Sequence, residues 1–75
     1  MKAYPNGKVK LRDAITIFKL NTELFSKEAN AWDSLGEAYL KSGDKQSAMI
    51  NYKKALEVDP NFPSAKKALK EIERK

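Results

Sequence analysis

Apolar residues recur at spacings of three and four along most of the chain, and no stretch alternates long enough to predict a strand. The first such run, over about residues 8–26, contains no Gly or Pro. Its apolar positions include Leu11, Ala14, Ile15, Phe18 and Phe25. Three further runs follow after short connections. We therefore predict an all-α chain whose four helices cover about residues 8–26, 29–42, 45–58 and 63–74.

The residues between these runs are typical of helix ends. Gly43 suits the left-handed turn that ends a helix, and Asp44 is a good N-cap for the next one. Asp59 precedes Pro60 and is therefore disfavoured in the α conformation, which ends the third helix. Pro63 suits the first position of the fourth helix.

The chain also repeats internally with a shift of 34 residues. Under this shift the first helix falls on the third, and the second falls on the fourth. The matching pairs include Ala14 with Ala48, Ile15 with Met49, Phe18 with Tyr52, Ala31 with Ala65, and Leu35 with Leu69. The sequence therefore predicts one complete helical hairpin with a half-repeat on each side.

The central repeat carries a specific motif at fixed spacing. Its positions are Trp32, Leu35, Gly36, Tyr39, Ala48, Tyr52, Ala55 and Pro60. This motif and its period resemble the tetratricopeptide repeat (TPR) family. The resemblance is strong over residues 29–62 and partial over about 8–75. It implies antiparallel helical hairpins that form a fragment of a right-handed α-solenoid.

The same resemblance implies how the chain is divided. Residues 1–7, with the turn sequence Tyr4-Pro5-Asn6-Gly7, are expected to be a flexible arm before a single domain at 8–75. That domain consists of a half-repeat at 8–28, the full repeat at 29–62 and a capping helix at 63–75. In the capping helix, Lys66, Lys70 and Glu73 replace the aromatic, Gly and Tyr of the motif, so no further hairpin is expected to follow.

Gly36 interrupts the second helix on its packing face. A glycine in a helix interior costs about 1 kcal/mol relative to Ala. Small residues allow two helix backbones to approach closely. Because Ala48 and Ala55 of the third helix are also small, we predict that Gly36 is the contact point of the hairpin.

Composition excludes several kinds of chemistry. The 75 residues include neither Cys nor His, and no Gly-rich phosphate loop or G-x-S-x-G motif occurs. Asp33 and Glu37 are four residues apart and share a helix face, as paired catalytic or calcium-binding carboxylates would. A solvated or ligand-facing stripe is the simpler interpretation. We predict a protein that is not an enzyme and has no cofactor or metal.

The net charge of +5 could indicate an anionic partner. Two groups carry many of the basic residues: Lys8, Lys10 and Arg12, and Lys66, Lys67, Lys70, Arg74 and Lys75. Acidic residues interleave with the second group and the fourth helix has no aromatic residue, so specific nucleic-acid binding is not predicted. The apolar face of the first helix is assigned to the core rather than to a membrane. Without a signal peptide or membrane span in this sequence, the default location is cytoplasmic.

The resemblance implies that the first helix of each hairpin lines a groove that binds a peptide or protein. Off the packing face of the second helix, five residues share an arc of about 100°. They are Asn30, Asp33, Glu37, Leu40 and Lys41. The family's best-known groove grips a carboxylate with Lys, Asn and Arg, but Asp33 and Glu37 stand where it needs Lys and Asn. An acidic stripe repels a carboxylate, so we expect a partner with basic or neutral contact residues.

A structural or assembly role is the alternative. Half-repeats at both ends resemble a piece of a longer array, such as the short TPR tails that follow bacterial hydrolase domains. Ile17, Leu20 and Leu24 are expected on the outer side of the first helix, where exposed apolar surface favours self-association. A homodimer through the first helix is therefore one form of this alternative.

Overall fold

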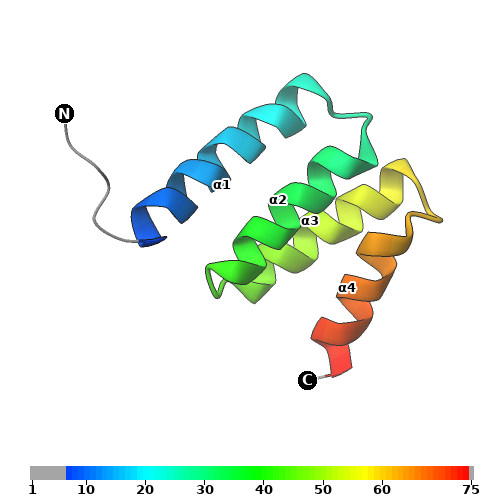
Figure 1. Cartoon of the computed structure of the whole chain (residues 1–75). Coiled ribbons are helices and arrows are strands. Elements are labelled where there is room, and N and C mark those ends of the chain that lie inside the picture. The colour runs from blue at the N-terminus through cyan, green and yellow to red at the C-terminus, as the bar shows by residue number, and fades with distance from the viewer. Residues whose placement is uncertain (1–6, 75) are drawn as a thin grey trace.

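The computed structural model describes the backbone of residues 7–74 and the side chains of residues 13–74. Four helices make up this part of the chain, which contains no strand. They are α1 (Gly7–Leu24), α2 (Ala29–Lys41), α3 (Lys45–Val58) and α4 (Pro63–Arg74) (Figure 1). The all-α prediction is confirmed. The predicted flexible arm lies outside the described residues except for Gly7, which begins α1.

α1 ends at Leu24, two residues before the predicted end at about residue 26. The Phe25 N–H still donates to the Asn21 carbonyl at 2.7 Å, but the Glu28 N–H turns back to the Phe25 carbonyl at 3.0 Å. Glu28 itself is extended (φ −104°, ψ 111°), which starts α2 in a new direction. The chain uses these residues to reverse, so they cannot continue the helix.

The turn between α2 and α3 follows the predicted chemistry. α2 ends at Lys41, one residue earlier than predicted. Gly43 adopts the left-handed conformation (φ 91°) that a side chain would disfavour. The Ser47 N–H donates to the Asp44 carboxylate at 3.1 Å and so caps α3. α3 ends as predicted, where Asp59 becomes extended.

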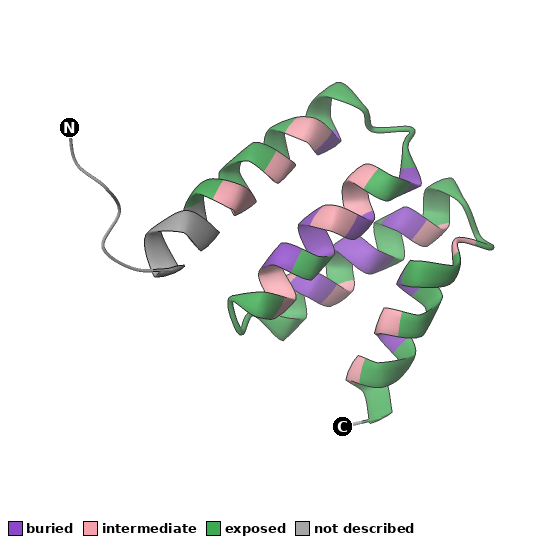
Figure 2. Ribbon diagram, viewed as in Figure 1, coloured by how far each residue is buried: buried purple, intermediate pink, exposed green. Residues whose placement is uncertain are grey.

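The helices stack side by side in chain order. α2 packs most extensively on α3, α1 packs on α2, and α4 packs on α3 (Figure 1). Buried residues concentrate on α2, α3 and the inner side of α4 (Figure 2). The buried apolar core consists of Ala29, Leu35, Ala38, Ala48, Tyr52, Ala55, Ala65 and Leu69. A hairpin alone cannot bury both of its faces, and α1 and α4 provide the neighbouring layers.

The contact at Gly36 shows why the second helix contains a glycine. A Cβ atom at Gly36 would lie 3.0 Å from the nearest ring atoms of Tyr52, closer than real Cβ atoms ordinarily come. The predicted partner helix is therefore correct. The nearest group, however, is the Tyr52 ring rather than Ala48 or Ala55. A small residue on α2 makes room for a large one on α3.

Trp32 joins the central hairpin to the segment that precedes it. Its indole N–H donates to the Ser26 carbonyl at 2.9 Å, which fixes the turn between α1 and α2. On the other side, the Lys54 Nζ lies 5.3 Å from the centre of the Trp32 rings, a cation–π contact from α3. The half-buried indole thus links α2 both to the turn that precedes it and to α3.

Candidate functional site

The five residues predicted on the open arc of α2 divide into two sets. Asp33 and Leu40 lie toward α4, because Asp33 bonds to the first turn of α4 and Leu40 lines a hollow with α4 residues. Asn30, Glu37 and Lys41 line hollows between α2 and α1. We call this arc the floor; it borders separate hollows toward α1 on one side and toward α4 on the other.

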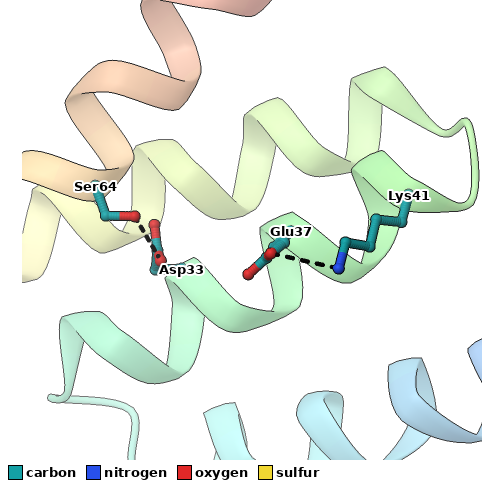
Figure 3. A network of polar contacts seen from close by, with 4 residues as sticks. All are labelled: Asp33, Glu37, Lys41 and Ser64. Carbon is teal, nitrogen blue, oxygen red and sulfur yellow. Dashed lines mark hydrogen bonds and ion pairs between the residues drawn. The ribbon is translucent and has the colours of Figure 1, made fainter.

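Asp33 is the most buried member of this set, at 8% exposed. One of its carboxylate oxygens, Oδ2, accepts a hydrogen bond from the Ser64 hydroxyl at 3.0 Å (Figure 3). The other, Oδ1, is buried and has no hydrogen-bond partner among the described residues. Burial raises the pKa of Asp33, and the nearby Glu37 adds to this, while the bond from Ser64 opposes it. Asp33 thus holds one unused acceptor at the α4 side of the floor.

Glu37 and Lys41 are the exposed members, with side chains 59% and 68% exposed. The Lys41 Nζ lies 3.6 Å from Glu37 Oε2, one turn away on the same helix (Figure 3). An exposed pair of this kind contributes only about 0.3–0.5 kcal/mol, so a partner can replace it at little cost. Glu37 remains available to a cationic group.

The carboxylates of the floor also influence the pKa of Tyr52, a core residue of α3. Burial raises the pKa of Tyr52 to about 12, and the charges of Asp33 and Glu37 contribute to the shift. Both carboxylates are therefore close enough to Tyr52 for their charges to act on its hydroxyl.

Shallow hollows border the floor. One of about 260 Å³ lies between α2, α3 and α4, and is lined by Leu40, Lys45, Ala68, Glu71 and Ile72. Two others, of about 220 Å³ and 340 Å³, lie between α1 and α2, and Ser34 lines both. The hollow beside Leu40 has the most apolar lining of these, and the hollow lined by Asn21 and Asn30 has the most polar.

Two residues of this site were not predicted from the sequence. Ser34 was missed because it lies between the packing face and the open arc of α2. Ser64 was missed because it lies on another helix, although the repeat itself gave a signal. Ser64 stands 34 residues after Asn30, at the corresponding position of α4. Reading the arc across the repeat would have included it.

Within the described residues, no three His, Cys, Asp or Glu side chains are grouped so as to hold a metal ion. In the same part of the chain, no helix is both long and apolar enough to cross a membrane.

Helices that pack side by side in chain order, as α1 to α4 do, are typical of a helical-repeat protein. The tetratricopeptide repeat family matches residues 29–62, the same 34 residues that carry the motif. This segment of the chain is therefore a tetratricopeptide repeat.

Two relatives extend the comparison. The heat shock protein STI1 of Saccharomyces cerevisiae is 41% identical over 64 residues, which is 85% of this chain and 10% of that protein. The mouse (Mus musculus) Superkiller complex protein 3 is 46% identical over 35 residues, or 47% of this chain and 2% of that protein. The chain thus spans only a small part of the length of each relative.

Proposed function

We propose that this chain is a non-enzymatic protein–protein interaction module. Its groove along α2 binds a peptide or protein whose contact residues are basic or neutral. The single observation that carries this proposal is the acidic floor, where Glu37 is exposed and Asp33 Oδ1 is buried without a partner. A cationic or N–H group is the natural complement to both.

Two further findings support this function. TPR repeats generally bind protein partners, and one relative is named as part of a complex. The hollow beside Leu40, between α2 and α4, can take one apolar side chain of such a partner. The floor and its hollows are shallow, so we expect an interface near or below the roughly 800 Å² per partner of standard complexes.

The experiment is a titration with labelled extended peptides that differ only in charge: lysine-rich, neutral and glutamate-rich. We expect the first two to bind in the groove and the third not to bind there. Glu37→Lys, an exposed change that leaves the core intact, should weaken binding of the lysine-rich peptide several-fold. Glu57→Lys makes the same charge change at an exposed site on α3 and serves as the matched control. Equal affinity for both variants would contradict the assignment of the groove.

A second candidate function is a structural or assembly element, and one observation favours it. Ile17, Leu20, Leu24 and Phe25 are 57%, 54%, 65% and 55% exposed. Exposed apolar surface of this kind marks association sites. The chain could then serve as the tail of a larger protein, such as a hydrolase, or form a homodimer through α1. Sedimentation over a range of concentrations tests the homodimer, because a monomer throughout would exclude it.

A further inference from the structure

One side of α4 carries a line of cations that faces away from α3. Lys66, Lys70 and Arg74 are spaced four residues apart, so they follow one another along a single helix face. All three are exposed, whereas Ala65 and Leu69 are buried on the side of α4 that joins the core (Figure 2). We call Lys66, Lys70 and Arg74 the basic row. At 1.5 Å per residue, it extends over about 12 Å of the helix.

The cations of α4 have no ion-pair partner among the described residues. Glu73 lies three residues after Lys70, and Glu71 lies four residues after Lys67, which are spacings at which ion pairs form on helices. Neither pair is in contact within the part of the chain that the structure describes, whereas the pair on α2 is. The basic row therefore keeps its charge available to another molecule.

Two glutamates set the width of this charged strip. Counting 100° per residue, the basic row and Lys67 occupy an arc of about 100° on α4. Glu73 and Glu71 lie just beyond its two edges. A narrow cationic strip between two anions fits a single acidic chain better than a broad anionic surface, because the outer charges of such a surface would meet the glutamates.

The composition of α4 argues against two other anionic partners. The helix has no aromatic residue on which the bases of a nucleic acid could stack. Every residue of α4 is described, and none of the large exposed apolar side chains, which could insert into a membrane, belongs to it. An acidic polypeptide is the anionic partner that requires neither feature.

We propose that the basic row binds an acidic segment of a partner polypeptide in an extended conformation. In an extended chain, side chains on one side recur about every 6.6–6.8 Å. This is close to the roughly 6 Å between successive cations of the row, so three carboxylates can meet Lys66, Lys70 and Arg74 in order. The row is separate from the floor on α2 and opposite in charge, so the proposal does not depend on what the groove binds.

Solubility alone does not require this arrangement. A helix face with both signs of charge interspersed is enough to keep a protein soluble. On α4 the cations instead gather in one strip, and the glutamates stand at its borders. Because the strip offers no apolar burial, its contact with a partner is electrostatic and weakens as salt is added.

The first test titrates the 75-residue chain with a short labelled peptide of alternating Glu and Ser at about 50 mM salt. NMR spectra of the backbone amides locate the contact. We expect saturable shifts between Lys66 and Arg74 and none between Asn30 and Lys41 of α2. Raising the salt to about 300 mM should weaken binding at least about fivefold. The same peptide with Gln in place of Glu is the control and should not bind.

The second test reverses one charge of the row. Lys70→Glu, at the centre of the row, should weaken binding of the acidic peptide at least about fivefold, because the peptide then meets a like charge. Lys19→Glu makes the same charge change at an exposed site on α1 and is the matched control. It should change the affinity less than about twofold. Circular dichroism checks that both variants remain folded.

Three results would overturn the proposal. One is the absence of saturable shifts between Lys66 and Arg74 at low salt. Another is an equal loss of affinity in the Lys70→Glu and Lys19→Glu variants, which would reduce the contact to attraction by the net charge. The third is tighter binding at α4 of a single-stranded oligonucleotide or an anionic vesicle than of the acidic peptide. None of these results bears on the groove, which is tested with lysine-rich peptides and Glu37→Lys.

Discussion

α1 and α3 carry the same part of the repeat, yet only α3 is a core helix. Phe18 of α1 and Tyr52 of α3 stand at equivalent positions, but Phe18 is half-buried and Tyr52 is 3% exposed. The difference comes from their neighbours. α3 lies between α2 and α4, whereas the extensive packing of α1 is on α2 (Figures 1 and 2). In a stacked array, burial is decided by the number of covering helices as much as by the side chain itself.

The largest effect should come from truncating this equivalent pair of aromatic residues. Tyr52→Ala removes a buried ring and is expected to cost about 3–5 kcal/mol of unfolding free energy. Phe18→Ala should cost less than about half of this, since its ring keeps much of its exposure in the folded state. Urea denaturation followed by circular dichroism measures both. Equal losses would mean that α1 is as well covered as α3.

Gly36→Leu should have the next largest effect. Leu is the better helix former by roughly 0.8 kcal/mol, so propensity alone predicts stabilisation. Because even a Cβ meets the Tyr52 ring at 3.0 Å, we instead expect overpacking to cost at least about 2 kcal/mol. Glu37→Leu, on the exposed side of α2, is the control and should change stability by less than about 0.5 kcal/mol. An unchanged or raised Tm for Gly36→Leu would refute the packing described for the hairpin.

Asp33→Asn should produce a smaller, pH-dependent effect. Burial raises the pKa of Asp33, so the folded state binds this proton more tightly than the unfolded state. Its ionisation therefore lowers stability as pH rises through the folded pKa, and the loss persists at neutral pH. Asn retains an acceptor for Ser64 without the charge. We expect it to raise stability by about 1 kcal/mol or less at pH 7.

The difference in unfolding free energy between the Asp33→Asn variant and the unmodified chain should shrink as pH falls from 7 toward the unfolded pKa of Asp. Thermal unfolding at several pH values measures this. A difference that grows on acidification would have the wrong sign for a buried carboxylate and would contradict its raised pKa.

The smallest effect is expected on the outer face of α1. Leu20→Gln keeps helix propensity and removes a side chain that is 54% exposed, so stability should change by less than about 0.5 kcal/mol. Leu69→Gln on α4, where the side chain is 9% exposed, is the matched change at a covered site and should cost several times more. A large loss for Leu20→Gln would indicate that the face is already covered in solution.

Most of the fold could be predicted from the sequence because helix spacing, turn residues and the 34-residue repeat are local or periodic signals. The helix that contacts Gly36 followed from the same register. The burial of Asp33 could not be predicted, because it depends on where the first turn of α4 settles and on Ser64. On α2 considered by itself, Asp33 lies on the open arc, and it is buried only once α4 is in place. The hollows beside the arc are likewise lined by residues of α1 and α4, which an analysis of one helix could not supply.

Hydrogen exchange of individual amides by NMR, in the 75-residue chain, tests most directly whether covering helices decide which segment is core. The structure predicts that amides from Asn51 to Ala55 exchange slowest, at or near the rate of global unfolding. Amides from Ile17 to Asn21, at the same repeat positions, should exchange at least about tenfold faster. Equal protection of the two segments would contradict the account.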